Sequence, residues 1–163
     1  MLSVWCGRAR APGEAGPVAR ASASPPSWAG HRRGLPFIGV CAAGAPAMAT
    51  SRRTGVPEAT GPVSTMADGI TVRVPVPTAV AWMREVVDDV LLVEEDIRLA
   101  PRTVRDALGL ILEPSGAVGI AAALRHDLGT APLGTILTGG NYSPGLLAEL
   151  APDPARVNRP VSA

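Results

Sequence analysis

The sequence predicts an α/β fold built around a mainly parallel sheet. Two short apolar runs, 36–41 and 90–93, have the length and boundaries of buried strands. They are separated by segments such as 78–88, in which apolar residues recur at helical spacing. Strands that alternate with helices in this way indicate a sheet covered by helices.

The composition fits one soluble domain with an aliphatic core. The 163 residues are 47% hydrophobic but only 3% aromatic, so Val, Leu, Ile and Ala must fill most of the core. No run of about 18 apolar residues is present that could span a membrane. Cys6 and Cys41 stand far apart, which predicts neither a disulfide framework nor a metal site and favours a reducing, cytoplasmic setting.

Charge is distributed unevenly along the chain. Residues 1–36 carry five arginines and a single acid, Glu14, so the rest of the chain is slightly acidic although the net charge is +1. A clustered basic face is therefore not expected, and nucleic acid is not a predicted partner. All 15 basic residues are arginine, and the chain contains no lysine.

The chain divides into a tail, a domain and a second tail. Residues 1–36 are rich in Ala, Pro, Ser, Gly and Arg and show no helical or strand period, so they are predicted to be a disordered tail. A targeting segment or a misplaced start of translation are the alternatives. The domain is expected over 37–150, followed by a loose tail over 151–163.

The first half of the domain is expected to begin with the strand 36–41 and a turn of small residues. A helix is expected to start at 47–49, and the Gly and Pro residues of 51–63 predict a loop. Residues 70–76 alternate between apolar and other residues, which predicts a short edge strand limited by Pro75 and Pro77.

Two helices and a strand are expected next. Thr78 is predicted to cap a helix that reaches 88 and buries Val80, Met83 and Val87. The buried strand 90–93 follows. Because proline suits the first turn of a helix, the next helix is expected to begin at Pro101, with an apolar stripe formed by Val104, Ala107, Leu108 and Ile111.

The last part of the domain ends in a turn that suits a ligand site. An Ala-rich helix is expected over 116–124 and a third buried strand over 134–137, followed by the turn 138–141. Ligands of open α/β sheets bind beyond the carboxyl ends of strands, and two glycines in the turn allow close approach to the backbone. Ser143 and Pro144 predict a helix that runs through Leu150.

Three motifs carry a resemblance to a known family. They are Thr65-Met66-Ala67-Asp68-Gly69-Ile70, Glu113-Pro114-Ser115-Gly116-Ala117 and Thr138-Gly139-Gly140-Asn141. In this order, and with the segment Val-Val-Asp-Asp-Val at 86–90, they resemble the C-terminal part of threonine and serine dehydratases. These are pyridoxal-phosphate enzymes of fold type II, related to serine racemase and the tryptophan synthase β chain. The resemblance implies an incomplete three-layer, parallel-sheet domain of the tryptophan synthase β-like kind over about 37–150.

The resemblance also implies a cofactor site. It places the hydroxyl of Thr138 against the pyridine nitrogen of pyridoxal phosphate and Glu113 near the ring, with Gly139, Gly140 and Asn141 completing the cofactor-binding residues. A hydroxyl leaves the ring nitrogen largely neutral, which makes the cofactor a weaker electron sink and favours elimination of water from a small amino acid such as serine or threonine. Taken singly, these motifs also have a simpler structural explanation. Residues 139–141 would then form only a tight turn, and residues 113–114 only a helix boundary.

The sequence departs from the family in three places. Without lysine the chain has no residue to which the family attaches the cofactor, and residues 1–36 lack the family's Gly-rich phosphate loop. The turn 41–47 lacks the acids with which some members bind a divalent metal, so no metal site is expected. We therefore assign no catalytic residue and expect a truncated, inactive member of the family.

Other interpretations of these departures stay open. One is a non-catalytic partner subunit that completes a separate lysine-bearing chain, and another is a misread open reading frame. A homo-oligomer or such a complementing chain is the expected kind of partner.

Overall fold

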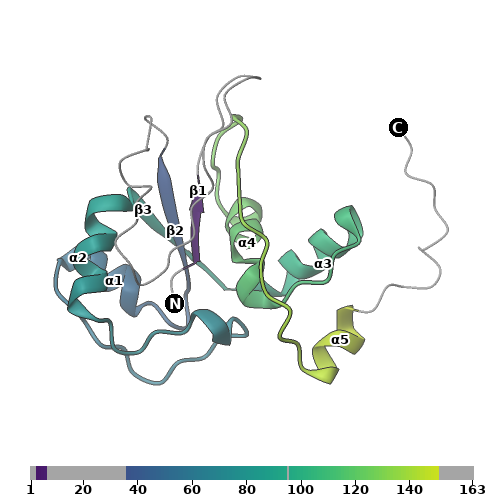
Figure 1. Cartoon of the computed structure of the whole chain (residues 1–163), viewed down its shortest axis with the longest axis horizontal. Coiled ribbons are helices and arrows are strands. Elements are labelled where there is room, and N and C mark those ends of the chain that lie inside the picture. The colour runs from purple at the N-terminus through teal and green to yellow at the C-terminus, as the bar shows by residue number, and fades with distance from the viewer. Residues whose placement is uncertain (1–2, 7–35, 95, 151–163) are drawn as a thin grey trace.

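The computed structural model describes residues 3–6, 36–94 and 96–150, which form a small sheet with helices on both faces (Figure 1). The strands β1 (Ser3–Cys6), β2 (Phe37–Ala42) and β3 (Asp89–Val93) lie in the order β1-β2-β3. Strands β2 and β3 are parallel, whereas β1 pairs antiparallel with β2. The α/β fold class is confirmed, with one parallel and one antiparallel pair in the described sheet.

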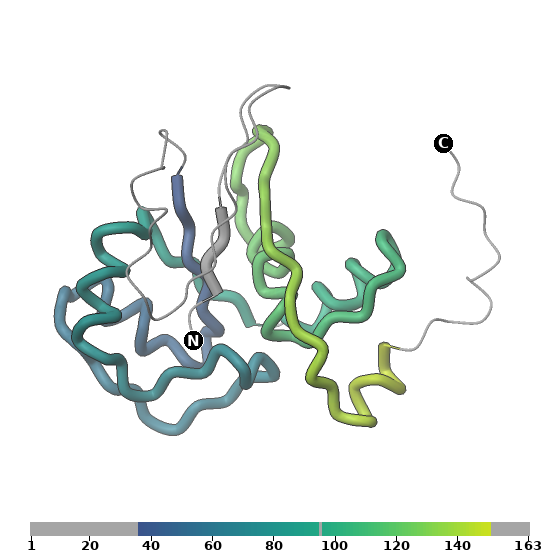
Figure 2. The backbone as a smooth tube through the Cα atoms, in the orientation of Figure 1, coloured from purple at the N-terminus to yellow at the C-terminus, as the bar shows by residue number. Residues whose placement is uncertain are grey.

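Strand β2 is the centre of the fold because both of its faces are covered. Phe37 and Cys41 point to the face covered by α1 (Ala47–Thr54) and α2 (Pro77–Val86), while Val40 and Ala42 point to the opposite face. Figure 2 shows the two groups of elements on either side of this strand. Strands buried on both faces consist of continuous apolar runs, which explains the sequence of β2.

Two hydrophobic clusters fill the spaces on either side of the sheet. The smaller cluster joins β2 to the first two helices and consists of Phe37, Cys41, Met48, Met83, Val86 and Val87. The larger cluster packs the other face of the sheet against α3 (Asp96–Leu108) and α4 (Val118–Arg125). Each fully buried Val or Leu side chain in these clusters contributes about 1.5–3 kcal/mol through the loss of apolar surface from water.

The helix α1 extends further than the sequence predicted. Residues 51–54, expected in a loop, form its last turn, and it ends at Gly55, whose φ of 85° is left-handed. Ser51 is fully buried, and its Oγ accepts a hydrogen bond of 2.8 Å from the backbone N–H of Glu58. This hydrogen bond satisfies the buried hydroxyl and ties the following loop to the helix.

The helix α2 starts earlier than predicted and lacks the predicted cap. It begins at Pro77, so Thr78 lies inside the first turn, and Val76 at the N-cap makes no side-chain hydrogen bond. Proline substitutes here for a cap, because its fixed φ suits the first helical position. The buried face is as predicted, since Val80, Met83 and Val87 are all buried.

The predicted edge strand at 70–76 is wrong. The segment follows a 3₁₀ turn, η2 (Asp68–Ile70), and its Val74 side chain is 73% exposed. The segment receives one isolated hydrogen bond from a loop, of 2.9 Å, from the N–H of Thr60 to the carbonyl of Arg73, and no ladder of such bonds to a strand of the described sheet. Alternation of apolar residues does not make a strand without a neighbouring strand to pair with.

The prediction that a helix starts at Pro101 is wrong. The helix begins at Asp96, and Pro101 lies inside it. An internal proline removes a hydrogen bond and costs about 3 kcal/mol. Burial offsets that cost, because the side of α3 that faces the core consists of Ile97, Ala100, Pro101 and Val104.

The apolar stripe expected on this helix is only partly right. Val104 is buried, but Ala107 and Leu108 are exposed, and Ile111 lies beyond the end of the helix. The residues of α3 that face the core therefore lie about one turn earlier in the sequence than the predicted apolar stripe.

The strand predicted at 90–93 is present but is not fully buried. In β3 only Val93 is buried, and Leu92 is 40% exposed. The outer edge of this strand is covered in part by His126, whose Nε2 lies 2.9 Å from the carbonyl oxygen of Leu92. A strand at the edge of a sheet is less enclosed than a central one, which accounts for the difference.

At the end of the domain, one predicted helix is confirmed, a second starts later than predicted, and the predicted strand is not formed. The helix α5 (Pro144–Leu150) begins as predicted, because Ser143 Oγ accepts a hydrogen bond of 3.2 Å from the N–H of Leu146. The Ala-rich helix starts at Val118 and is preceded by a 3₁₀ turn, η3 (Pro114–Gly116). The strand predicted at 134–137 is not formed, since only Gly134 makes a bridge.

Predictions for the two tails fall largely outside the described residues. Ser3–Cys6 forms β1 in a stretch where no regular structure was expected. The predictions for 7–35 and 151–163 concern residues that lie outside the described ranges. Among the helices of the described ranges, none has both the length and the apolar character needed to cross a membrane.

Candidate functional site

The side chain of Glu113 and the turn 138–141 lie against each other. Glu113 precedes η3 with an extended backbone, and its Oε2 accepts a hydrogen bond of 3.2 Å from the N–H of Asn141. Gly139 adopts a left-handed φ of 86°, and a Cβ added to it would lie 2.0 Å from Oε1 of Glu113. The carboxylate thus supports the turn, and only glycine fits at position 139.

The backbone of Thr138 packs directly on η3. A Cβ added to Gly116 would lie 1.4 Å from the carbonyl oxygen of Thr138, so the two backbones touch. The Thr138 side chain is exposed, and no hydrogen bond joins its hydroxyl to any residue in 36–94 or 96–150. The hydroxyl is therefore available to a ligand, while the backbone that carries it is held from behind.

Ser115 connects this arrangement to the motif at 65–70. Its Oγ accepts a hydrogen bond of 2.9 Å from the N–H of Gly69, and the side chain is buried. Ala67 and Ala117, one from each motif, are fully buried in the larger cluster. The three motifs recognised in the sequence are thus neighbours in space.

Tyr142 is a residue of this site that the sequence analysis missed. Its hydroxyl donates a hydrogen bond of 2.5 Å to the carbonyl of Ile111, and its ring lies next to Gly140. These hydrogen bonds of Tyr142 and Glu113 both tie the turn to the segment 111–113. Its position as the chain's one tyrosine, directly after the Gly-Gly-Asn turn, is a signal that could have identified it.

The residues present fit one edge of the cofactor expected from the resemblance. The Thr138 hydroxyl, which makes no hydrogen bond within the described residues, stands beside two glycines, which leaves room for a flat ring to approach the backbone of the turn. Covalent attachment of the cofactor does not fit this chain, because the chain contains no lysine. Glu113, Thr138, Gly139, Gly140 and Asn141 are brought together, and their role in cofactor binding stays a prediction.

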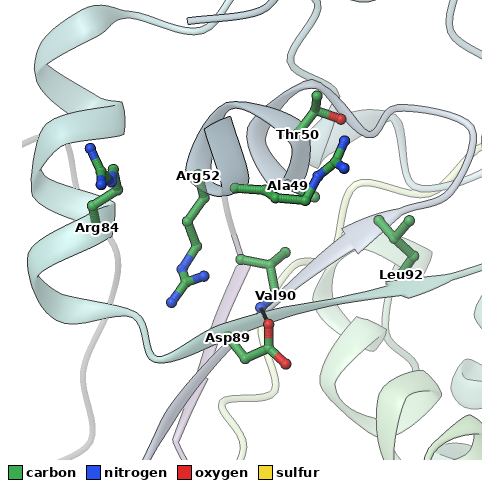
Figure 3. A pocket seen from close by; sticks show the side chains of 8 residues that line it. Ala49, Thr50, Arg52, Arg84, Asp89, Val90 and Leu92 are labelled. Carbon is green, nitrogen blue, oxygen red and sulfur yellow. Dashed lines mark hydrogen bonds between the residues drawn. The ribbon is translucent and has the colours of Figure 1, made fainter. Parts of the chain in front are cut away.

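A pocket of about 630 Å³ lies elsewhere, between α1, α2 and the start of β3 (Figure 3). None of the five predicted site residues lines it. Three arginines do, together with Asp89 and an apolar floor. The sequence analysis missed this pocket, although arginines in the last turns of both helices were a readable signal.

Cys41 does not offer a nucleophile. Its side chain is only 5% exposed, and burial raises the pKa of the thiol to about 11. The thiolate is the reactive form of cysteine, so a thiol held neutral by burial is inert near neutral pH.

Comparison with known proteins agrees with the three motifs. Residues 18–139 match the family model described as pyridoxal-phosphate dependent enzyme. L-threonine ammonia-lyase of Geobacter sulfurreducens is 37% identical over 109 residues, which cover 64% of this chain and 27% of that protein. Serine racemase of Bos taurus is 36% identical over 88 residues, which cover 49% of this chain and 25% of that protein.

A solved structure shows the same fold. The processed form of threonine deaminase isoform 2 from Solanum lycopersicum superposes with a TM-score of 0.68 and 29% sequence identity, covering 76% of this chain and 38% of that one. The chain spans about a quarter of the length of the curated relatives that it matches. The family model covers most of the chain, and the similar structure shares its arrangement of strands and helices, so the chain belongs to the family of pyridoxal-phosphate-dependent enzymes of fold type II, whose threonine and serine dehydratase-like members it resembles.

Proposed function

We propose that this chain forms the C-terminal portion of an enzyme that releases ammonia from a small hydroxy amino acid of the serine or threonine class. One observation carries the proposal. The exposed hydroxyl of Thr138 is presented on a turn that Glu113 supports by a hydrogen bond to Asn141. The similarity to L-threonine ammonia-lyases and serine racemases supports the choice of substrate class.

Each residue of the turn has a distinct part in this proposal. Thr138 offers a neutral hydrogen-bonding group to the edge of the cofactor ring, and Gly139 and Gly140 keep that approach free of side chains. Glu113 acts through the turn and is a positioning residue. Pyridoxal phosphate, when bound, supplies the electron sink for chemistry at the substrate's α-carbon. A neutral group beside the ring makes the cofactor a weaker electron sink, which favours elimination of water from the substrate.

The chain is inactive alone in this proposal, because a lysine must come from elsewhere. Lysine attaches the cofactor and moves the α-proton in the family that the sequence resembles, and all 15 basic residues here are arginine. We place the lysine and the phosphate-binding loop in residues outside this sequence. A cytoplasmic location belongs to the same proposal and is supported by Cys41, which is a free cysteine, since disulfides are typical of oxidising compartments.

The second candidate is a non-catalytic subunit that completes a separate lysine-bearing chain. It is supported by leucines that are exposed on and after α3 and on α4, namely Leu99, Leu108, Leu110 and Leu124, since a second chain could cover them. A homo-oligomer could cover these side chains as well, but it would not supply a lysine.

A complementation experiment tests both candidates. The lysine-bearing portion of the Geobacter sulfurreducens L-threonine ammonia-lyase is either fused to this chain or produced beside it, and ammonia release from L-threonine and L-serine is measured. The relative's own C-terminal portion is the positive control. We expect activity from the fused protein, none from the chain alone, and a loss of at least about tenfold in the fused Thr138→Val variant.

The outcomes separate the candidates. Activity only in the fusion supports a portion of one enzyme, whereas activity from two separate chains supports a complementing subunit. Ammonia release by the unfused chain alone would overturn the proposal. So would an inactive fusion beside an active positive control.

A further inference from the structure

The helix α5 depends on its neighbours for its place in the fold. It has seven residues, and helices shorter than about 12 residues are only marginally stable by themselves in water. One of its side chains is buried, that of Leu150, with 2% of its surface exposed. Figure 1 shows α5 beside α3. The contacts between these two helices therefore decide where α5 lies.

Three arginines of α3 contact the carboxyl end of α5. Arg98, Arg102 and Arg105 follow one another at helical spacing, which places them on one side of α3. Nη1 of Arg98 lies 3.0 Å and Nη2 of Arg102 lies 2.7 Å from the same oxygen, Oε1 of Glu149. Nη1 of Arg105 donates a hydrogen bond of 3.1 Å to the carbonyl of Leu150. Positive side chains suit this position, because the carboxyl end of a helix carries about half a negative charge.

Apolar packing brings α5 against the 3₁₀ turn η3 as well. Leu146 and Leu150 lie one helical turn apart and line a small cavity together with Pro101 of α3 and Pro114 of η3. The cavity measures about 10 Å³, about the least that one water molecule needs, so the three elements are closely packed. Because η3 also carries the turn 138–141, this turn and α5 share one support.

The chain between the candidate cofactor turn and α5 is short. Two residues, Tyr142 and Ser143, separate Asn141 from the first residue of α5. Three steps of the chain span at most about 11 Å, so a large movement of α5 must pull on the turn. The hydrogen bond of Tyr142 to Ile111 holds this link at one point, and α5 holds it at the next.

From these contacts we infer that Arg98 and Arg102 are positioning residues, which act through Glu149 and α5 to fix the carboxyl end of the turn 138–141. The side chains of Arg98, Arg102 and Glu149 are 56%, 41% and 35% exposed, so each ion pair is weak by itself. The two pairs share one carboxylate oxygen and therefore act together. The inference rests on the proposed function only for what the turn binds.

Amide hydrogen exchange in the full chain tests the inference. The N–H of Leu147, bonded to the carbonyl of Ser143, reports on α5, and the N–H of Asn141 reports on the turn. In Glu149→Ala both amides should exchange about two- to tenfold faster, as expected for the loss of two exposed ion pairs. Alanine is the best helix former, so a loss of helix propensity does not explain such an increase. The N–H of Ala121, inside α4, is the internal reference and should not change.

Arginine variants separate this network from a general effect of charge. Arg98→Gln and Arg102→Gln should each produce part of the increase, whereas Arg102→Lys keeps the charge and should produce less. Either Gln substitution added to Glu149→Ala should have no further effect, because its partner is already gone. Arg125→Gln is the matched control. It removes an exposed ion pair of 3.9 Å to Asp96, the first residue of α3, and should leave both reporter amides unchanged.

Added salt should reproduce the effect of the substitution. Exposed ion pairs are screened at high ionic strength, so about 0.5 M NaCl should speed exchange at Leu147 and Asn141 relative to Ala121 in the parent chain. The same salt should change these ratios little in Glu149→Ala, which has no ion pair left to screen between α3 and Glu149.

Three results would overturn the inference. Unchanged exchange at Leu147 in Glu149→Ala would show that the ion pairs do not hold α5. Faster exchange at Leu147 with unchanged exchange at Asn141 would show that the turn is held without α5. An equal increase in Arg125→Gln would show a general effect of lost charge. An inactive fused enzyme would overturn the proposed function but would leave these exchange rates as they are, so the two failures are distinguishable.

Discussion

The Oγ of Ser115 lies 2.9 Å from the backbone nitrogen of Gly69 and accepts its hydrogen bond, joining η3 to η2 across 46 residues of sequence. This contact connects two of the three motifs that identify the family. The third, at 138–141, packs on the same 3₁₀ turn through Gly116 and Thr138. The turn at Pro114–Gly116 is therefore the support on which the candidate cofactor site is built.

Removal of the Ser115 hydroxyl should lower the stability of the protein. Ser115→Ala leaves the N–H of Gly69 without its acceptor, and we expect the free energy of unfolding to fall by about 1 kcal/mol. Urea denaturation measures the change. Ser64→Ala serves as the control, since Ser64 is exposed and its backbone, not its side chain, bonds to Gly44. Equal losses in the two variants would contradict this role for the Ser115 hydroxyl.

A methyl group at position 116 should be far more damaging than one at position 145. The Cβ of Gly116→Ala would lie 1.4 Å from the Thr138 carbonyl oxygen, so one backbone must move, and we expect a loss of at least about 3 kcal/mol. The Cβ of Gly145→Ala meets nothing within 4 Å in α5, and alanine is the better helix former. Thermal unfolding should show a large decrease in Tm for the first variant and none for the second.

The carboxylate of Glu113 should protect the turn from opening. In Glu113→Ala the N–H of Asn141 loses its acceptor, and amide hydrogen exchange at this position should become about five- to tenfold faster. Glu113→Gln keeps an oxygen acceptor and should exchange more slowly than the Ala variant. The amide of Leu146, bonded to Ser143, is the internal reference and should not change. Unaltered exchange at Asn141 in the Ala variant would rule out this support.

Stability should decrease above pH 9 because of Cys41. Burial raises the pKa of its thiol from 9.0 to about 11, so between these values the unfolded chain loses a proton that the folded chain keeps. Proton release by the unfolded state favours unfolding, and the loss should reach about 2–3 kcal/mol by pH 11, with no contribution below pH 9. Urea denaturation across this range measures it in a Cys6→Ser background. Cys41→Ala should lack this part of the slope; a slope unchanged in that variant would assign it to other groups.

Local signals in the sequence predicted the elements that depend on short stretches of chain. The apolar run of β2 and the Ser143-Pro144 start of α5 were both found from residue types alone. The buried face of α2 followed from the spacing of Val80, Met83 and Val87. The proximity of Glu113 to the turn 138–141 was expected only from the family motifs. The spacing of these residues does not indicate it, because they lie 25 or more positions apart in the sequence.

Tertiary packing decided the remaining features, since they depend on neighbours distant in sequence. The helix α3 continues through Pro101 because burial of its core side outweighs one lost hydrogen bond. Residues 135–137 form no strand, because an apolar run becomes a strand only where another strand offers its backbone. The arginine pocket likewise exists only where α1 and α2 come together at Gly55. The sequence by itself determined the family, the local elements and the absence of lysine, whereas tertiary contacts determined which apolar faces are buried and which arginines share a pocket.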